Sequence, residues 1–299
     1  MSYSKTLQNV LEYTEKNNVS GSVLSRAAGI SAGALSAYLS GKYTGNITNI
    51  ESKLQAVLDR ETEKKAGAEH RVTPTFVETN SSRLFFEVAR LCHLDGEFGV
   101  CYGDAGLGKT MSAWEYSRLY SDSILIEADV GYTPRVVASK IFNLLCNGDR
   151  GTIDDMRDTI IDRLKGSGRL IIVDEAENLP HASLELLRRI CDKSGVGLLL
   201  SGMPRLIGNL TGQRGQFAQL YSRVGIVVKL IPASDKDTQV IVQKYIPVSN
   251  GLWKSYHQES KGNPRRLFKL IRASVRISGI NHISIDADVI KAASRELLK

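Results

Sequence analysis

The stretch Gly103-Asp-Ala-Gly-Leu-Gly-Lys-Thr110 decides the fold. It matches the pattern G-x-x-x-x-G-K-S/T and lies between a predicted strand, Phe98–Tyr102, and a predicted helix that runs to about Tyr120. Glycines let the backbone curl so that its N–H groups face phosphate oxygens, and the helix N-terminus adds its dipole. Lysine neutralises the β- and γ-phosphates, and threonine supplies a hydroxyl to Mg²⁺. We therefore predict an ATP and Mg²⁺ site formed by Gly103, Asp104, Ala105, Gly106, Leu107, Gly108, Lys109 and Thr110.

The second half of this site is the run Leu170-Ile-Ile-Val-Asp174-Glu175, four apolar residues followed by two acids. The run predicts a buried strand, and doubly wound sheets bind ligands at the carboxyl ends of their strands. We expect Asp174 to hold Mg²⁺ through water and Glu175 to polarise the attacking water, which indicates hydrolysis as well as binding. A strand ending at a solvated turn shows the same pattern, but a spacing of about 65 residues from the phosphate loop favours the catalytic interpretation.

Strands and helices alternate around both motifs. Further strands are expected at Ser123–Glu127, Leu170–Val173, Val196–Ser201 and Gly225–Leu230, with helices between them. This order predicts an α/β core in which helices cover both faces of a parallel sheet. We expect a helix-turn-helix domain at 1–60, a linker at 61–80, an ATPase core at 81–231 and a small helical domain at 232–299.

Composition excludes several classes of protein. The 299 residues are 42% hydrophobic, and no window approaches the ~18 apolar residues of a membrane span. The polar first ten residues do not form a signal peptide, and the four cysteines lack C-x-x-C spacing, so we expect a cytoplasmic protein with reduced cysteines and no membrane partner. The net charge of +7 is local, because residues 225–299 carry 13 Lys and Arg against 6 Asp and Glu. Such a segment favours a polyanion, either nucleic acid or an anionic membrane surface.

Residues 20–40 predict two short helices joined by a turn through Gly29-Ile-Ser31. With the following Gly41-Lys-Tyr43, they resemble the helix-turn-helix of Cro and repressor proteins. The second helix is poor in Arg, Asn and Gln and offers little direct base readout, so a helical packing module without a DNA role is the alternative. If the segment binds DNA, the groups that reach phosphates or bases are Ser31, Ser36, Lys42 and Tyr43.

Three further elements resemble parts of the AAA+ ATPases. One is the strand that ends in Ser201-Gly-Met203, where that family carries sensor 1. Another is the Ser-Arg pair at Arg223, where the family carries an arginine finger, and the last is the Gly-Asn-Pro-Arg run at Arg265, where it carries sensor 2. The resemblance implies these roles for Ser201, Arg223 and Arg265, with Met203 competing for the first and Arg214 for the second. An arginine finger acts in trans, which implies a homo-oligomer with ATP between subunits.

The helix after Pro264 carries Arg265, Lys269, Arg272 and Arg276 within about 60° of arc. No acid stands between residues 260 and 285. We assign Arg265 to nucleotide and predict that the other three bind DNA phosphates, a solvated helix face being the alternative. The loop after the second strand adds a second set of DNA candidates, for which a helix-starting loop at Pro134 is the alternative. This set is Tyr132, Thr133, Arg135 and Arg150.

The order of parts resembles the Mu B family of phage transposition proteins, which are AAA+ ATPases that act as ATP-dependent target DNA activators. The resemblance extends over nearly the whole chain and includes Thr75-Phe-Val-Glu-Thr79, Ile171-Ile-Val-Asp-Glu-Ala176 and the Leu-Tyr-Ser-Arg stretch at Arg223. It implies ATP-dependent filaments on double-stranded DNA with little sequence preference and delivery of that DNA to a transposase. It also implies hydrolysis stimulated by DNA and transposase, target immunity, and action in the cytoplasm of a bacterial host cell. The alternatives are a helix-turn-helix regulator with an ATPase switch and a helicase loader.

Overall fold

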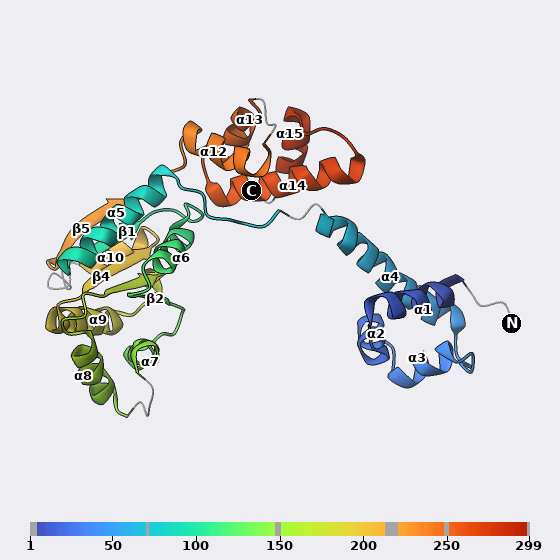
Figure 1. The fold of residues 1–299 in the computed structure, drawn as a ribbon, viewed down its shortest axis with the longest axis horizontal. Coiled ribbons are helices and arrows are strands. Elements are labelled where there is room, and N and C mark those ends of the chain that lie inside the picture. The colour runs from blue at the N-terminus through green and yellow to red at the C-terminus, as the bar shows by residue number, and fades with distance from the viewer. Residues whose placement is uncertain (1–4, 70–71, 147–150, 213–220, 248–250, 298–299) are drawn as a thin grey trace. The chain divides into compact units, whose positions relative to one another are not determined.

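The computed structural model describes residues 5–69, 72–146, 151–212, 221–247 and 251–297 (Figure 1). The chain divides into two compact units, one of Met1–Arg71 with Val275–Ile283 and the other of Val72–Ser274 with Ser284–Lys299. No helix in these ranges is long and apolar enough to cross a membrane.

The N-terminal part of the first unit is helical. It contains α1 (Lys5–Asn17), α2 (Gly21–Ala28), α3 (Ala32–Leu39) and α4 (Ile47–Glu69). The two short helices predicted within residues 20–40 are present as α2 and α3, and Gly29 ends α2 in the left-handed conformation that glycine adopts without a steric penalty. Helix α4 continues through Glu69, so part of the segment predicted as a linker is helical. The apolar core of this unit includes Val10, Leu24, Leu35 and Leu54.

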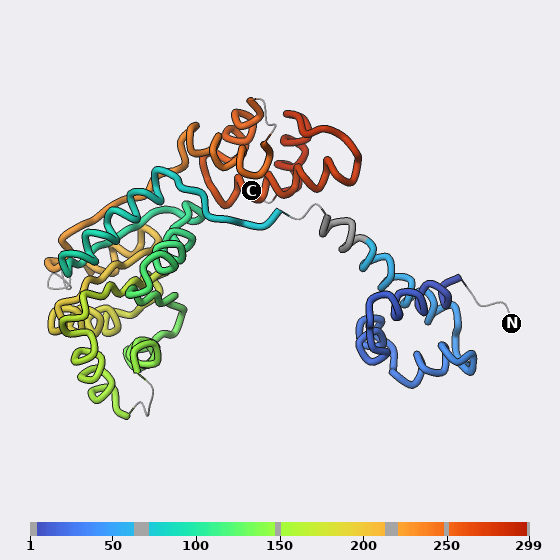
Figure 2. Tube along the Cα trace, viewed as in Figure 1, coloured from blue at the N-terminus to red at the C-terminus, as the bar shows by residue number. Residues whose placement is uncertain are grey.

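The second unit contains a five-stranded parallel sheet with the order β2-β3-β4-β1-β5. Its strands are β1 (Phe98–Tyr102), β2 (Ser123–Glu127), β3 (Leu170–Asp174), β4 (Gly197–Gly202) and β5 (Val224–Lys229). The predicted strands agree with these to within one residue at each end. Strands far apart in the chain lie side by side, as the colours along the trace in Figure 2 show.

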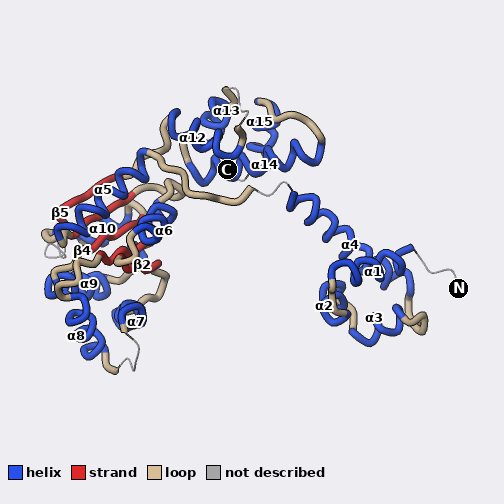
Figure 3. Tube along the Cα trace, viewed as in Figure 1, coloured by secondary structure: helices blue, strands red, loops and turns tan. Residues whose placement is uncertain are grey.

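Helices cover both faces of this sheet, as predicted (Figure 3). On one face, α5 (Asn80–Asp95) and α6 (Lys109–Leu119) pack over an apolar layer that includes Phe85, Tyr116 and Ile172. On the other face, α7 (Pro134–Leu145), α8 (Ile153–Leu164) and α9 (His181–Ser194) pack over a second layer. Burial on both sides explains why β3 and β4 are continuous apolar runs and do not alternate with polar residues.

Short elements follow the central strands, and helices end the chain. The 3-10 turn η1 (Ala176–Asn178) follows β3, and α10 (Arg205–Thr211) follows β4. The C-terminal helices are α12 (Asp235–Tyr245), α13 (Trp253–Ser260), α14 (Pro264–Asn281) and α15 (Ala287–Glu296). The register aligns Tyr102 with Gly202 and Val173 with Leu200, so the carboxyl ends of β1, β3 and β4 meet at one edge. A ligand site of a parallel sheet belongs at that edge.

Candidate nucleotide site

The glycine loop lies between β1 and α6, as predicted, and two of its glycines are required by their backbone. Gly106 and Gly108 have φ of 84° and 91°, a region that other residues adopt only with strain. A β-carbon on Gly106 would also lie 2.5 Å from the Asn263 side-chain oxygen. The start of α14 is docked here, because the Arg265 N–H donates to the Gly106 carbonyl at 3.1 Å and Asn263 Nδ2 donates to the Ala105 carbonyl at 2.8 Å.

The Lys109 ammonium points back at this loop. Its Nζ donates to the carbonyl oxygens of Gly103 at 2.6 Å and Asp104 at 2.9 Å. Burial lowers the pKa of Lys109, and the nearby Asp174 and Glu177 carboxylates partly oppose that shift. A phosphate group in the loop would stabilise the charged form, because it brings negative charge to a partly desolvated ammonium.

Asp174 joins three elements at the carboxyl edge of the sheet. Its carboxylate is 1% exposed and accepts hydrogen bonds from Thr110 Oγ1 at 2.6 Å and Ser201 Oγ at 2.8 Å. A hydroxyl and a carboxylate side by side are the hard oxygen ligands that Mg²⁺ prefers, so Thr110 and Asp174 fit the predicted metal.

Ser201 itself is fully buried, and its hydroxyl binds Asp174. Ser201 does not line the pocket beside it, and the contact with nucleotide that the resemblance implied for Ser201 stays a prediction. One pocket, which we call the nucleotide pocket, is lined by the glycine loop, Asp174 and Glu175, and at this strand end by Gly202 and Met203. Met203 was the alternative candidate for sensor 1 in the sequence. Ser201 therefore orients the carboxylate of Asp174, and Met203 is the one of the two sensor candidates that lines the pocket.

Glu175 follows Asp174 with an exposed side chain and a φ of 52°. Its Oε2 accepts a hydrogen bond from Asn178 Nδ2 at 3.2 Å, and Asn178 Oδ1 accepts one from Arg205 Nη2 at 2.6 Å. Arginine only donates, so the orientation of the Asn178 amide is fixed by chemistry. This chain of hydrogen bonds links α10 to the candidate base.

Glu177 is a site residue that sequence reasoning missed. It lines the same pocket as Lys109, and its buried Oε2 has no hydrogen-bond partner in the described part of the chain. A β-carbon on Gly202 would lie 2.2 Å from that oxygen, so the glycine makes room for the carboxylate. The available signal was a further acid two positions after Glu175 on a turn that leaves a buried strand.

The nucleotide pocket has a volume of about 450 Å³ and extends from the glycine loop to an apolar end. That size is typical of small-molecule sites. Its apolar end lies partly in the predicted linker, which therefore contributes to the site. The Thr75 N–H donates to the Tyr245 hydroxyl at 2.9 Å, which ties this segment to α12. The end is lined by Pro74, Thr75, Phe76, Val77, Ile241, Tyr245 and Phe268, none of which was predicted as a site residue.

The sequence assigned only one basic residue of α14 to the nucleotide, but three of them line the nucleotide pocket. Arg265, Lys269, Arg272 and Arg276 are all exposed, as a stripe on one helix face requires. Arg265, Lys269 and Arg272 line the nucleotide pocket together, whereas Arg276 does not. Within the described residues, the first three form no ion pair. Lys269 and Arg272 are therefore in reach of the nucleotide site as well as of a solvent-side polyanion.

Arg223 lies at the amino ends of the strands, whereas the glycine loop of the same chain lies at their carboxyl ends. It precedes Val224, which pairs with Phe98 at the start of β1, whereas the glycine loop follows the end of β1. A five-residue strand separates them by about 16 Å. The side chain is 60% exposed, and its Nε lies 3.9 Å from Asp192 Oδ2. Arg223 is thus available to another molecule. Its competitor, Arg214, lies outside the described residues.

The core loop predicted to touch DNA has structural contacts of its own. Thr133 caps α7 by accepting from the Val136 N–H, and Pro134 occupies the first turn, which agrees with the helix-starting alternative. Tyr132 packs against the core under Lys140, whose Nζ lies 5.7 Å from the ring centre. Arg135 is exposed and donates to the Gly151 carbonyl at 3.1 Å. Arg150 lies outside the described residues.

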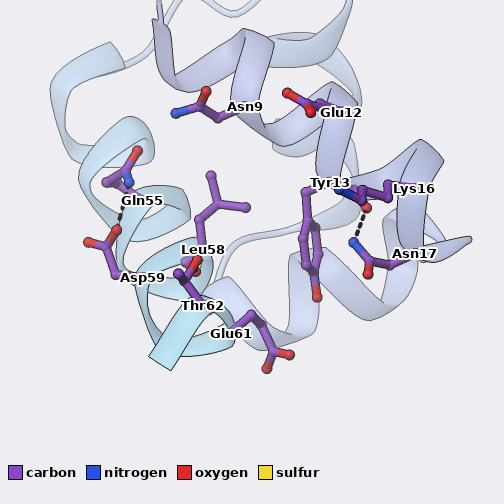
Figure 4. A pocket seen from close by; sticks show the side chains of 10 residues that line it. All are labelled: Asn9, Glu12, Tyr13, Lys16, Asn17, Gln55, Leu58, Asp59, Glu61 and Thr62. Carbon is purple, nitrogen blue, oxygen red and sulfur yellow. Dashed lines mark hydrogen bonds between the residues drawn. The ribbon is translucent and has the colours of Figure 1, made fainter. Parts of the chain in front are cut away.

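In the first unit, the four predicted DNA residues also differ in their availability. Ser31 caps α3 by accepting from the Ala34 N–H at 3.1 Å, and Tyr43 packs against the core. Ser36 and Lys42 are exposed. A separate polar pocket of about 240 Å³ lies between α1 and α4 (Figure 4). Its lining includes the carboxylates of Glu12, Asp59 and Glu61 against Lys16 alone, so it repels phosphate and is no second nucleotide site.

Known proteins resemble this chain in sequence and in fold. A family model described as an AAA domain matches residues 93–210. The Mu-like prophage FluMu DNA transposition protein B of Haemophilus influenzae is 32% identical over 251 residues, which cover 80% of this chain and 85% of that protein. The ATP-dependent target DNA activator B of Escherichia phage Mu is 28% identical over 222 residues, which cover 73% of this chain and 70% of that protein.

Solved structures share the architecture at low identity. The Aeropyrum pernix ORC2 protein in its ADPNP-ADP complexes superposes with a TM-score of 0.59 at 16% identity, over 79% of this chain and 73% of that chain. The ORC1 protein of the same organism, in complex with DNA, has a TM-score of 0.52 at 18% identity, over 74% of this chain and 66% of that chain. These likenesses support the AAA+ fold. With the assembled glycine loop and the sequence relatives, they lead to one conclusion: the chain belongs to the Mu transposition protein B family of AAA+ ATPases.

Proposed function

We propose that this chain hydrolyses ATP to ADP and phosphate, assembles into filaments on double-stranded DNA with little sequence preference, and delivers that DNA to a transposase. The observation that carries the proposal is the convergence of Lys109, Thr110 and Asp174 at one pocket, with Glu175 exposed beside them. The DNA and transposase parts draw on the relatives, one of which is named for DNA transposition and another for target DNA activation.

Each residue has a defined task in hydrolysis. The loop N–H groups, Lys109 and Arg265 would hold the phosphates, and Thr110 and Asp174 would hold Mg²⁺, which would supply neutralisation of phosphate charge. Glu175 accepts a proton from the attacking water. Arg223 of a second copy stabilises charge on the transferred phosphoryl group. Hydrolysis then depends on assembly, and DNA and transposase stimulate it by promoting or altering that assembly.

The proposed DNA contacts combine exposed residues of both units. On α14 they are Lys269, Arg272 and Arg276, whose charge a phosphate backbone would neutralise with release of counterions. Arg135 adds an exposed guanidinium in the core, and Ser36 and Lys42 add polar groups near α3. The small side chains of α3 offer few direct base contacts, which fits weak sequence preference. Target immunity would follow if the transposase removes such filaments from DNA near its own element.

We expect replacement of Lys269, Arg272 and Arg276 by Ala to weaken DNA binding and to reduce the slope of log K against log salt by about 2 to 3, because each phosphate contact contributes about 0.9. Fluorescence anisotropy of a random duplex at several salt concentrations measures this. Changing Lys254, Lys291 and Arg295, three exposed cations outside the stripe, removes the same charge and is the matched control. An equal loss of slope in the control would contradict a specific role for the stripe. ATP affinity is measured in parallel, since two of the three replaced residues, Lys269 and Arg272, line the nucleotide pocket.

We expect Asn178→Ala to lower kcat about tenfold while KM for ATP changes less than about twofold, because the amide orients Glu175 and does not line the nucleotide pocket. Arg205→Ala should act in the same direction, since Arg205 fixes the amide. In a Glu175→Gln background, Asn178→Ala should cause no further loss in single-turnover hydrolysis. A full additional loss there would show that Asn178 acts elsewhere.

Electron microscopy tests the proposal as a whole. With a random-sequence duplex and a slowly hydrolysed ATP analogue, we expect continuous filaments that are absent without nucleotide. Discrete occupancy of one sequence, without filaments, would contradict the proposal and favour a sequence-reading regulator.

A further inference from the structure

The turn after β3 places a second acidic side chain at the nucleotide pocket. Ala176 is buried in the core, and its two neighbours, Glu175 and Glu177, both line the pocket. The turn is held from α10, because Asn209 Nδ2 donates to the Glu177 carbonyl at 2.9 Å. Glu177 is therefore fixed beside the candidate base by a contact that does not use its carboxylate.

One oxygen of the Glu177 carboxylate is unsatisfied. Its Oε2 is buried and has no hydrogen-bond partner within the described ranges. Two donors of the same pocket are directed elsewhere, because Lys109 donates to carbonyls of the glycine loop and Thr110 donates to Asp174. A buried acceptor without a donor costs free energy, so it calls for a water, an ion or a catalytic role.

The carboxyl end of β4 makes room for this carboxylate. A β-carbon on Gly202 would overlap Glu177 Oε2. The hydroxyl of Ser201 is turned to Asp174, and Met203 offers only a thioether, which is a weak acceptor. Among the described residues of this wall, Glu177 supplies the strong acceptor oxygens.

The chemistry of the carboxylate selects what it can hold once nucleotide is bound. An ionised carboxylate accepts hydrogen bonds, and phosphate oxygens also accept them, so Glu177 cannot pair with a phosphate group. The ribose hydroxyls and the adenine amino group are donors, but they would lie toward the apolar end of the pocket. The donor left at the phosphate end is the water that attacks the terminal phosphate. This water has two protons, and Glu175 takes one of them.

We propose that Glu177 is a further catalytic residue, which accepts a hydrogen bond from the second proton of the attacking water while Glu175 takes the first. The inference rests on the proposed function, in which Glu175 is the base. The water oxygen bonds to the terminal phosphorus as the bond from that phosphorus to ADP breaks, and ADP leaves with the electron pair. The first proton goes to Glu175, and the second stays on the phosphate product. Two acceptors fix the orientation of the water, whereas one would leave it free to rotate.

Glu177→Ala should lower kcat by about 10² without raising the Kd for ATP more than about twofold, because the lost contact is to water and not to nucleotide. Glu177→Gln keeps an acceptor oxygen and should lose less than about tenfold, which a base could not tolerate. Asp162→Ala, which removes an exposed acid of α8, is the matched control for loss of one negative charge.

Gly202→Ala tests the same contact from β4. In the wild-type chain its β-carbon displaces the Glu177 carboxylate and should lower turnover at least about tenfold. In the Glu177→Ala chain the space is empty, so the same change should cost less than about twofold. Equal losses in the two backgrounds would overturn the inference.

Two measurements do not depend on turnover. Glu177→Ala should weaken binding of ADP with aluminium fluoride, which mimics the transferred group with its attacking water, at least about tenfold while the Kd for ADP alone changes less than about twofold. The ligand-free variant should unfold at a temperature no lower than the wild-type chain, because an unpaired buried acceptor is removed. A fall in both the unfolding temperature and the affinity for ADP would assign Glu177 a structural role and overturn the inference.

The remaining outcomes separate this inference from the proposed function. Turnover kept in Glu177→Ala but lost in Glu175→Gln overturns the inference and leaves the proposed function standing. Turnover lost in Glu177→Ala but kept in Glu175→Gln makes Glu177 the base, which overturns both assignments. A large rise in the Mg²⁺ concentration that Glu177→Ala needs for half-maximal turnover would place Glu177 on a metal-bound water and also overturn the inference.

Discussion

Glu175→Gln should reduce ATP turnover by about 10² to 10⁴ while the Kd for ATP changes less than about threefold. The glutamine keeps the shape of the side chain and still accepts a hydrogen bond from Asn178, but it cannot take a proton from water. The phosphate contacts proposed for the loop N–H groups, Lys109 and Arg265 do not involve this side chain. Phosphate release under saturating ATP measures the turnover, and binding of a fluorescent ATP analogue measures the affinity.

The same variant should stabilise complexes with DNA, since nucleotide that is not hydrolysed keeps subunits assembled. Lys109→Ala is the informative contrast, because it should lose nucleotide binding and, with it, DNA complexes. If turnover survives in Glu175→Gln, Glu175 is not the activating base. Glu177 lines the same pocket, and its buried Oε2 has no hydrogen-bond partner among the residues that the structure describes, so it would be the next carboxylate to test.

The strands and the first half of the site were predictable from sequence because they depend on local pattern. The glycine loop fixes its own backbone through Gly106 and Gly108, and buried parallel strands such as Leu170–Asp174 are continuous apolar runs. Thr110 lies in the first turn of the helix after β1 and Asp174 ends β3, and they meet across β4 because the carboxyl ends of parallel strands lie at one edge of the sheet. That edge follows from the fold class alone.

The apolar half of the pocket was not predictable in the same way. The segment around Thr75 is short, polar and proline-containing, which is typical of a linker, and its place is fixed by Tyr245, 170 residues away. Likewise, helical spacing puts Lys269 and Arg272 on the face of Arg265, but it does not say which neighbour that face meets. For Ser201, a shift of one residue in the predicted end of β4 decides whether the side chain faces the pocket or the neighbouring Asp174. In each case a tertiary contact, absent from local pattern, made the decision.

Arg223→Ala should lower turnover by about 10³ to 10⁵, which is the range by which an arginine supplied across an interface accelerates nucleotide hydrolysis. ATP binding by the single chain should be retained. The retention follows from position, because Arg223 stands at the amino edge of the sheet, away from its own glycine loop. Wild-type turnover per subunit should rise with protein concentration as copies assemble, and the variant should lack that rise. Arg223→Lys should recover little, since an ammonium cannot replace the planar fork of donors that guanidinium offers to phosphate.

The comparison with Arg214→Ala decides between the two arginines in this stretch of chain. Arg163→Ala, an exposed arginine on α8, serves as the control for loss of one positive charge. If Arg214→Ala loses turnover and Arg223→Ala keeps it, the finger is Arg214. If Arg223→Ala instead loses ATP affinity in the isolated subunit, Arg223 supports folding or the nucleotide site of its own subunit. A role of Arg223 in the site of a neighbouring subunit is then excluded. The expected pattern, turnover lost and affinity kept in Arg223→Ala alone, makes hydrolysis a property of neighbouring subunits, so ATP is consumed only where enough copies have assembled to hold DNA.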